Sequence, residues 1–429
     1  MIKDIILEQK LKREEILRSN YINREKSADI QTNGALDNKL IKVVIGPRRA
    51  GKSFFAAHIF KPNESAYINF DDERISKIKN YDDILDDVFS VYGNTKFLLF
   101  DEIQNMRDWE LFANRLQRYG YNLMLTGSNA KLLSKDLATH LTGRYQLVEL
   151  MPFNFREFLR ARNFHFSREQ LALAEVKGAM LNHLENFIRN GGFPELVTAG
   201  LSADNYLNTL LESLLFRDVV KRYRLRFSQK IYDLELYLIN NIASEFSYDK
   251  LCRKLKFTNW ATLTKYVGYL EEAYLIFGLS RYSHKAGERL SSPKKAYVAD
   301  NGYISAKAVQ SSPNYGKLME NLVFTELVKS GCRPNFDLFY YKTRNGKEVD
   351  FAVRRGAQVK SLIQAAYQAD DIDVQKREVR ALAEAAEELN CQDLMVLTWD
   401  YEAVESLGDL KVKFVPIWKW LLCIGTDAK

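Results

Sequence analysis

A glycine-rich segment that also carries a lysine and a serine is the part of this chain best suited to chemistry. Residues 46–53 read Gly-Pro-Arg-Arg-Ala-Gly-Lys-Ser and fit the pattern G-x-x-x-x-G-K-[ST]. The glycines allow a tight bend that points successive backbone N–H groups at a phosphate chain. Lys52 adds a positive charge for the β- and γ-phosphates, and the Ser53 hydroxyl is a ligand for Mg²⁺. The segment therefore predicts a site for ATP and Mg²⁺. The residues expected to contact the nucleotide are Gly46, Pro47, Arg48, Arg49, Ala50, Gly51, Lys52, Ser53 and Phe54.

Two carboxylates follow the apolar run 96–100 further along the chain. If this run is a strand, it delivers Asp101 and Glu102 to the edge of the sheet where open α/β folds bind ligands. We expect Asp101 to hold Mg²⁺ through water and Glu102 to polarise the attacking water as a general base. The alternative is a strand that simply ends in exposed acids.

Three further polar residues are candidates for completing the site. Ser128 and Asn129 follow the apolar run 122–126, where they would sense the γ-phosphate or orient the water. An ordinary cap at the end of a strand is the alternative. Arg144 is a candidate arginine finger acting across a subunit interface of a homo-oligomer, and a surface salt bridge is its alternative.

The elements that must position these residues are short strands alternating with helical patterns. This alternation predicts an α/β fold, a parallel sheet with helices on both faces. The apolar run 54–60 reads as a buried helix directly after the glycine loop, so the loop would lead into a helix N-terminus. The expected strands are 41–45, 66–70, 96–100, 122–126 and 146–150.

Length and composition point to a cytoplasmic protein without a membrane segment. The 429 residues predict two to four domains, and a hydrophobic content of 46% suffices for a sizeable core. The net charge of +7 permits nucleic acid as a partner without requiring it. The four cysteines lie far apart, which predicts neither a zinc site nor a disulfide framework. The N-terminus has charges throughout and no signal-peptide pattern.

Several segments resemble the AAA+-type ATPases of bacteria and archaea that carry a C-terminal domain of unknown function. The resemblance covers nearly the whole chain. It is carried by GPRRAGKS, FLLFDEIQ, LTGSN, LTGRYQLVELMPFNFREF, NGGFPE (190–195), KKAYVADNGY (294–303) and YYKTRNGKEVDF (340–351). It implies a P-loop AAA+ ATPase core, a winged-helix unit and a C-terminal α/β fold similar to PD-(D/E)XK nucleases. The expected parts are an N-terminal helical extension (1–38), the ATPase core (39–155), a helical linker or lid (156–228), the winged helix (229–305) and the nuclease-like domain (306–429).

Two segments make DNA a candidate partner. Residues 217–226 contain five basic residues with a tyrosine among them, a composition able to follow a phosphate backbone or to form a solvated helix face. The winged-helix unit would place a helix over 259–273, with Trp260, Leu263, Val267 and Leu270 on one face. Its polar residues that would reach base edges are Thr258, Asn259, Thr262, Thr264 and Lys265.

The resemblance to nucleases does not extend to a complete catalytic set. Such an enzyme needs an acid on an early helix, an Asp on one strand and Glu-x-Lys on the next strand. Glu320 and Asp350 match the first two, but Gln364 and Ala366 stand at the last two positions. A glutamine is a poor replacement for a charged metal ligand, and an alanine cannot orient water. We therefore expect an inactive nuclease-like domain, in which Asp350 pairs with Lys347 or Arg354.

These features lead to one main hypothesis and one alternative. The main hypothesis is an ATP hydrolase that uses Mg²⁺-dependent hydrolysis as a conformational switch and couples it to DNA, with Lys52, Glu102 and Arg144 as catalytic residues. The alternative is a DNA-binding or protein-recruiting scaffold in which ATP is a structural or switch ligand. In that case the C-terminal domain recruits a protein partner. No base-reading motif distinguishes ATP from GTP.

Overall fold

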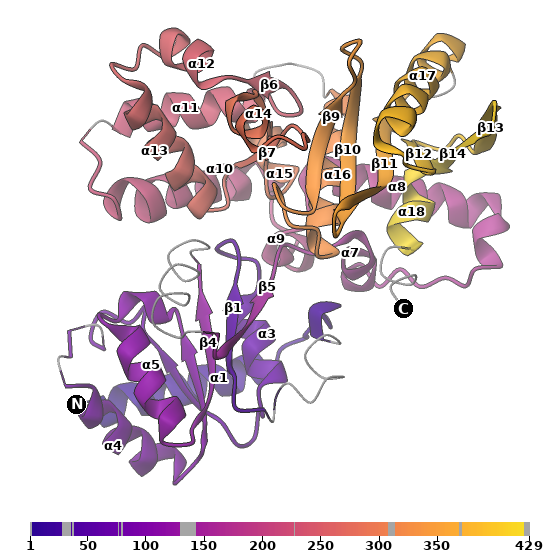
Figure 1. The fold of residues 1–429 in the computed structure, drawn as a ribbon. Coiled ribbons are helices and arrows are strands. Elements are labelled where there is room, and N and C mark those ends of the chain that lie inside the picture. The colour runs from indigo at the N-terminus through magenta and orange to yellow at the C-terminus, as the bar shows by residue number, and fades with distance from the viewer. Residues whose placement is uncertain are drawn as a thin grey trace. The chain divides into compact units, whose positions relative to one another are not determined.

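The computed structural model forms two compact units, Met1–Phe153 and Asn154–Lys429 (Figure 1). No helix among the described residues is both long enough and apolar enough to cross a bilayer. The described residues are 2–27, 36, 38–75, 77–78, 80–128, 143–226, 228–307, 314–368 and 371–423.

A parallel sheet of five strands forms the centre of the first unit, which confirms the predicted α/β fold. Its order is β2-β3-β4-β1-β5, and every neighbouring pair is parallel. Because β4 lies between β1 and β3, its end is next to both the glycine loop that follows β1 and the carboxylates that end β3. The strands are β1 (Ile41–Ile45), β2 (Ala66–Asn69), β3 (Phe97–Asp101), β4 (Asn122–Gly127) and β5 (Tyr145–Glu149).

Helices cover both faces of this sheet because its strands are apolar on both sides. Val43 and Ile45 pack in a cluster with the helices α1, α4 and α5, whereas Val44 between them packs in a second cluster with α3. Figure 1 shows α3 and α5 on opposite sides of the strands. The helices are α1 (Ile2–Arg18), α3 (Lys52–Ile59), α4 (Tyr81–Tyr92) and α5 (Trp109–Arg118).

The N-terminal helix α1 belongs to this compact unit, where it covers the edge strand β2. Gln9 Nε2 donates to the carbonyl of Asn69 at 3.0 Å, and Gln9 Oε1 accepts from the Asn69 N–H at 2.9 Å. The amide side chain thus pairs with backbone groups that an open sheet edge leaves unpaired. Arg13, buried on the same helix, donates to the carbonyl of Pro62 at 2.9 Å. Gln9 therefore pairs with the backbone of β2 at its open edge, and Arg13 contacts the segment before this strand.

The first half of the second unit is mostly helical and includes a small antiparallel sheet of order β6-β8-β7. Leu263, Val267 and Leu270 of α13 are buried, whereas Trp260 at its first position is 53% exposed. The elements are α7 (Phe155–Ala161), α8 (Ala174–Asn190), α9 (Pro194–Ala199), α10 (Ala203–Ser213), the π-helix η4 (Leu214–Lys221), α11 (Ser228–Asn240), β6 (Glu245–Phe246), α12 (Tyr248–Lys254), α13 (Trp260–Glu272), β7 (Phe277–Ser280), α14 (Ala286–Ser291), β8 (Lys294–Tyr297) and α15 (Gly302–Lys307).

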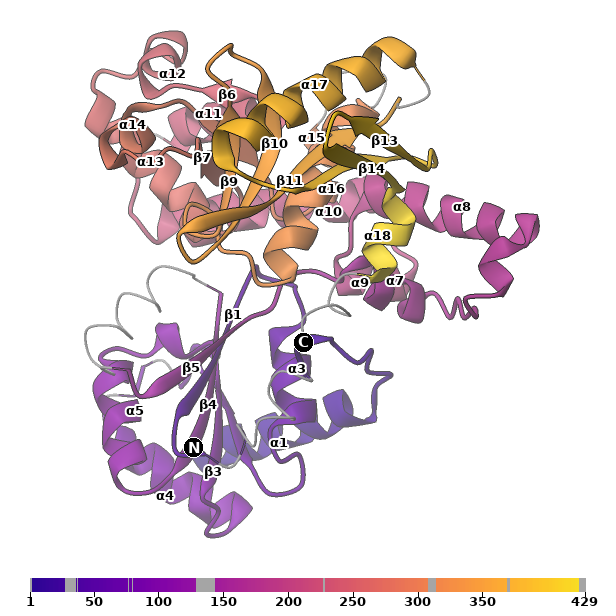
Figure 2. The ribbon, with the colours of Figure 1, turned by 45° about the vertical axis from the view of Figure 1, so that its right-hand side comes forward.

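The second half of this unit contains a mixed sheet of six strands in the order β13-β14-β12-β11-β10-β9, with α17 lying along it (Figure 2). Val349 and Ala352 of β10 pack with α17. A register shift between these two residues turns Asp350 and Phe351 toward β8. The elements are α16 (Tyr315–Lys329), β9 (Leu338–Lys342), β10 (Glu348–Arg355), β11 (Gln358–Ala366), α17 (Ile372–Leu389), β12 (Asp393–Thr398), β13 (Ala403–Leu407), β14 (Leu410–Pro416) and α18 (Ile417–Cys423).

Glu235 on α11 makes the stability of the second unit dependent on pH. Its carboxyl is buried, and its Oε1 has no hydrogen-bond partner among the described residues. Burial raises the pKa of Glu235 to about 8, with Lys307 opposing and Glu212 adding to the effect. The folded chain therefore keeps this proton up to about pH 8, whereas an unfolded glutamate loses it at about pH 4.3. The stability that protonated Glu235 contributes is therefore fully present below about pH 4.3. It is lost progressively as the pH rises from there through about 8.

We expect Glu235→Gln to remove this pH-dependent loss because the glutamine amide carries no proton to lose. The variant should match the wild type at pH 4 and exceed it by on the order of 2 kcal/mol at pH 8. Urea unfolding across this range measures the difference, and Glu387→Gln at an exposed glutamate of the same unit serves as control. A constant difference at all pH values would contradict the assignment.

Candidate nucleotide-binding site

The backbone of the glycine loop adopts conformations that only particular residues tolerate. Gly46 follows β1 with φ +149°, and a Cβ at this position would lie 2.0 Å from the carbonyl oxygen of Leu150. Gly51 has φ 88° and is the N-cap of α3. Because glycine has no capping side chain, an anion is the natural partner for the N–H groups of the first helical turn. The loop thus leads directly into a helix N-terminus, as the sequence predicts.

The Lys52 ammonium lies across this loop. Lys52 is buried, and its Nζ donates to the carbonyl oxygens of Pro47 at 2.8 Å and Gly46 at 3.1 Å. These contacts keep the positive charge beside the amides that would bind phosphate. The lysine is therefore close to where the β- and γ-phosphates are expected.

Asp101 at the end of β3 accepts hydrogen bonds from three hydroxyl groups. Ser53 Oγ donates to its Oδ1 at 2.9 Å, Tyr67 donates to its Oδ2 at 2.9 Å, and Thr126 Oγ1 donates to Oδ1. Burial and the charge of Glu102 raise the pKa of Asp101, and the three hydroxyls oppose that rise. The adjacent hydroxyl of Ser53 and carboxylate of Asp101 are hard oxygen donors, a set that fits Mg²⁺.

Glu102 occupies a left-handed turn beside Asp101, with φ 52° and ψ 46°. Its N–H donates to Thr126 Oγ1 at 3.1 Å, and its Oε2 accepts from Gln104 Nε2. Burial by itself raises the pKa of Glu102, but the charge of Lys52, the Gln104 hydrogen bond and the charge of Arg48 lower it below its usual value. The carboxylate is therefore ionised at neutral pH, as a general base requires.

The other predicted site residues lie in different places. Ser128 is buried after β4, with its Oγ 3.4 Å from Gln104 Nε2. Asn129 lies outside the described residues. Phe54 is 42% exposed on α3. Arg144 is exposed, and its carbonyl accepts a hydrogen bond from the Ile41 N–H at the start of β1. The glycine loop lies at the other end of this strand. Arg144 therefore does not reach the loop of its own chain, and its role across an interface stays a prediction.

Four residues that contact the site were missing from the prediction. Thr126 and Tyr67 bind Asp101, and Gln104 binds Glu102. Arg24 Nη1 donates to the carbonyl of Ala50 in the loop at 2.9 Å. Thr126 carries a usable signal, because it is a hydroxyl within an otherwise apolar strand. The Tyr67 and Arg24 contacts depend on strand order and chain folding, which local patterns do not specify.

Thr126 connects the two carboxylate positions, so its hydroxyl is expected to matter for both. In Thr126→Val, Asp101 loses a donor and the Glu102 N–H loses its acceptor, at a cost of about 1–3 kcal/mol. Thermal unfolding measures this loss, and any nucleotide turnover should fall with it. Thr126→Ser keeps the hydroxyl and should restore both. Equal behaviour of the valine and serine variants would show that the hydroxyl has no such role.

Outside this site, the structure alters the predicted pairings. Asp350 contacts Lys295 at 3.0 Å, not the predicted Lys347, which instead pairs with Glu384 at 2.8 Å. The other predicted partner, Arg354, lies over the ring of Phe336. The strand register decides this difference, because it turns Asp350 toward β8.

Two residues of the candidate DNA surface already have structural partners. Tyr223 stacks on Tyr269 with ring centroids 3.7 Å apart. The Asn259 side chain caps α13 by accepting from the Thr262 N–H at 2.7 Å. Their aromatic and amide groups are therefore engaged within the chain.

Family models match three successive parts of the chain. One described as an AAA domain matches residues 38–159, and two described as domains of unknown function match residues 181–313 and 315–420. The first match covers the glycine loop and both carboxylates, and supports an ATPase-type function for the first unit.

Two relatives align with most of the chain. The uncharacterized protein MJ1544 of Methanocaldococcus jannaschii is 35% identical, over 97% of this chain and 96% of the relative. An uncharacterized protein of Haemophilus influenzae is 26% identical, over 75% of this chain and 82% of the relative. Among solved structures, AMPPCP-bound DnaA from Aquifex aeolicus is 17% identical and covers 59% of this chain and 90% of its own, with a TM-score of 0.27.

Proposed function

The chain belongs to the same family as the uncharacterized protein MJ1544 of Methanocaldococcus jannaschii, and we propose that it is a Mg²⁺-dependent ATPase whose hydrolysis acts as a conformational switch. The observation that carries this proposal is the direct hydrogen bond between Ser53 of the glycine loop and Asp101 at the end of β3. It brings the phosphate-binding loop and the carboxylates to one edge of the sheet, where phosphoryl transfer requires both.

The proposed role of each site residue follows from its position. Lys52 and the amides at the start of α3 bind the phosphates, and Ser53 and Asp101 hold Mg²⁺. The ion, when bound, neutralises charge on the phosphate oxygens. Glu102 accepts a proton from the attacking water, and Gln104 holds its carboxylate in place. Ser128 and Asn129 are proposed to orient the water. Arg144 of a second subunit is proposed to stabilise the transition state.

Steady-state hydrolysis by the purified full chain tests this function. We expect release of inorganic phosphate from ATP that requires Mg²⁺ and stops when EDTA is added in excess. A parallel assay with GTP determines the base preference. Bound ATP without turnover at any protein concentration would contradict the hydrolase assignment and favour ATP as a structural ligand. A rise in specific activity with protein concentration would support Arg144 acting between subunits.

A second candidate function is coupling of this ATPase to DNA. The order of α11, β6, α12, α13, β7 and β8 supports a winged-helix unit, and exposed basic residues precede it. These are Arg217, Lys221, Arg224 and Arg226. Such a surface attracts phosphate backbones in a salt-dependent way. Electrophoretic mobility shifts at low salt, combined with ATPase assays with and without duplex DNA, test the coupling. No shift and no stimulation would favour the scaffold alternative.

The C-terminal part, residues 306–429, is proposed to be a nuclease-like domain without nuclease activity. Glu320 and Asp350 lie close to a common neighbour, Lys295. Gln364 Oε1 accepts a hydrogen bond from the Asp350 N–H, a structural role for the side chain at the expected metal-ligand position. In the scaffold alternative this part would recruit a protein partner, which pull-downs with and without residues 310–429 would detect.

A further inference from the structure

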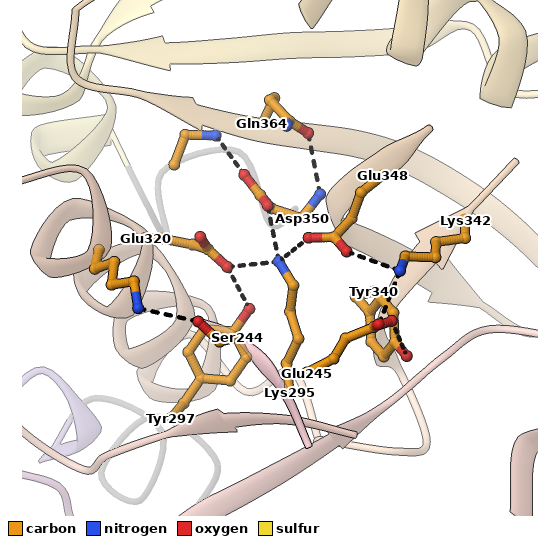
Figure 3. A network of polar contacts seen from close by, with 12 residues as sticks. Ser244, Glu245, Lys295, Tyr297, Glu320, Tyr340, Lys342, Glu348, Asp350 and Gln364 are labelled. Atoms are coloured by element: carbon orange, nitrogen blue, oxygen red, sulfur yellow. Dashed lines mark hydrogen bonds and ion pairs between the residues drawn. The ribbon is translucent and has the colours of Figure 1, made fainter. Parts of the chain in front are cut away.

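Three carboxylates of the C-terminal part surround the ammonium of Lys295 (Figure 3). Lys295 comes from β8 and is only 1% exposed. Its Nζ lies 2.7 Å from Glu348 Oε1, 2.8 Å from Glu320 Oε1 and 3.0 Å from Asp350 Oδ1. An ammonium group has three N–H donors, so these three acceptors satisfy it completely. The cluster therefore binds a cation that is covalently part of the chain.

Contacts other than Lys295 hold the carboxylates in position. Asp350 Oδ2 accepts from the Ala365 N–H at 3.1 Å, and the Asp350 N–H donates to Gln364 Oε1 at 3.0 Å. Tyr297 donates its hydroxyl to Glu320 Oε1 at 2.7 Å. The backbone of β10 is anchored on both sides by β9 and β11. The oxygen atoms should therefore remain near one point when the lysine side chain is shortened.

An outer shell of charges surrounds this cluster. Lys342 lies 3.6 Å from Glu348 Oε2 and 2.8 Å from Glu245 Oε2. Lys317 on α16 donates to Ser244 Oγ at 3.0 Å. Lys342 and Lys317 lie at the outside of the cluster. Lys295 alone among the described residues contacts all three central carboxylates. Loss of Lys295 therefore leaves concentrated negative charge that Lys342 cannot neutralise from outside.

We propose that Lys295 is the resident cation of this three-carboxylate site, and that shortening its side chain converts the site into one for a divalent metal ion such as Mn²⁺ or Mg²⁺. Carboxylate oxygens are the ligands that both ions prefer, and water can complete the coordination in the space left by the side chain. The described residues of the native chain contain no group of acids, histidines or cysteines arranged to hold a metal. The ammonium occupies the point at which the three carboxylate oxygens converge.

The protonation of the cluster agrees with this assignment. Burial by itself lowers the pKa of Lys295, but Tyr297 and the three carboxylates raise it well above its usual value. Burial and the Asp350 charge raise the pKa of Glu320 to about 7, and Lys295 opposes this rise. The lysine is therefore kept charged. In a variant without Lys295, another cation or protonation would stabilise the three carboxylates.

The test uses the full-length Lys295→Ala variant without nucleotide. We expect one additional Mn²⁺ per chain relative to the wild type in an electron paramagnetic resonance titration. Millimolar Mn²⁺ should also raise the melting temperature of the variant by several degrees and leave that of the wild type unchanged. Lys342→Ala is the matched control, because it removes a lysine from the same network outside the centre. It should bind no additional ion.

The double variant Lys295→Ala/Asp350→Asn should lose the additional ion, since it lacks one of the three carboxylates. Equal Mn²⁺ binding by wild type and Lys295→Ala, or unchanged binding in the double variant, would overturn the proposal. If Lys295→Ala is insoluble alone, refolding with and without Mn²⁺ replaces the titration. Recovery only with the metal supports the proposal, and failure under both conditions overturns it. The loop variant Lys52→Ala should not affect this result.

Discussion

Glu102→Gln is expected to lower ATP turnover by roughly 10²- to 10⁴-fold, the usual contribution of a general base. ATP affinity should change only a few-fold, because Lys52 and the amides of the glycine loop remain in place. A glutamine side chain retains the size of Glu102 and can still hydrogen-bond to Gln104. It cannot accept the proton of the attacking water. Phosphate release gives the turnover, and titration with a fluorescent ATP analogue gives the affinity.

Two further variants make this prediction specific. Glu64→Gln is a control at an exposed glutamate of the same unit and should have wild-type turnover. Lys52→Ala should lose both binding and turnover, because it removes the charge beside the phosphates. Wild-type turnover in both Glu102→Gln and Lys52→Ala would reject the proposed active site. Loss of nucleotide binding in Glu102→Gln would assign Glu102 a structural role instead.

Gly191→Ala is expected to destabilise the second unit by more than about 3 kcal/mol, or to prevent its folding. Gly191 ends α8 with φ 76° and ψ −166°, a region that essentially only glycine adopts. A Cβ there would lie 1.5 Å from Asp300 Oδ1. Asp300 cannot simply move away, because its carboxylate accepts from the N–H groups of Gly192 at 2.8 Å and Gly302 at 2.9 Å.

Gly178→Ala on the same helix provides the matched control. It lies within α8, and apart from the backbone of its own helix no atom of the described residues would come within 4 Å of a Cβ there. Alanine at such a helical position should stabilise by roughly 0.5–1 kcal/mol. Urea denaturation measures both variants. If Gly191→Ala unfolds at the wild-type midpoint, Asp300 does not hold these two segments together.

The contacts of Asp300 also indicate a packing role for two motifs that are distant in the sequence. The segments 190–195 and 294–303 meet at Asp300. Nearby, Phe193 packs on Tyr303 with ring centroids 5.4 Å apart, and Asn301 donates to the carbonyl of Ile188 at 2.9 Å. Their glycines are required by backbone geometry and close approach. The two motifs therefore serve the packing of the second unit.

Local patterns predicted the ends of the strands of the first sheet to within one residue. The alternation of apolar runs predicted all five strands of the first sheet, because a strand buried on both faces must be apolar along its length. The pattern from Gly46 to Ser53 predicted the phosphate loop, because its backbone conformation and its charge arise within eight residues. The strands β13 and β14 were missed, since exposed residues such as Val404 weaken their alternation.

Tertiary structure alone decided which side chains meet. Thr126 reaches Asp101 because β4 lies directly beside β3. Arg144 lies away from the glycine loop because it precedes β5, at the end of the sheet where β1 begins. Lys295 reaches three acids because a register shift in β10 turns Asp350 toward β8. Strand order and register result from the packing of residues far apart in the chain. The sequence by itself therefore determined the phosphate loop and its carboxylates, and the tertiary structure determined their hydroxyl partners and the cation of the acidic cluster.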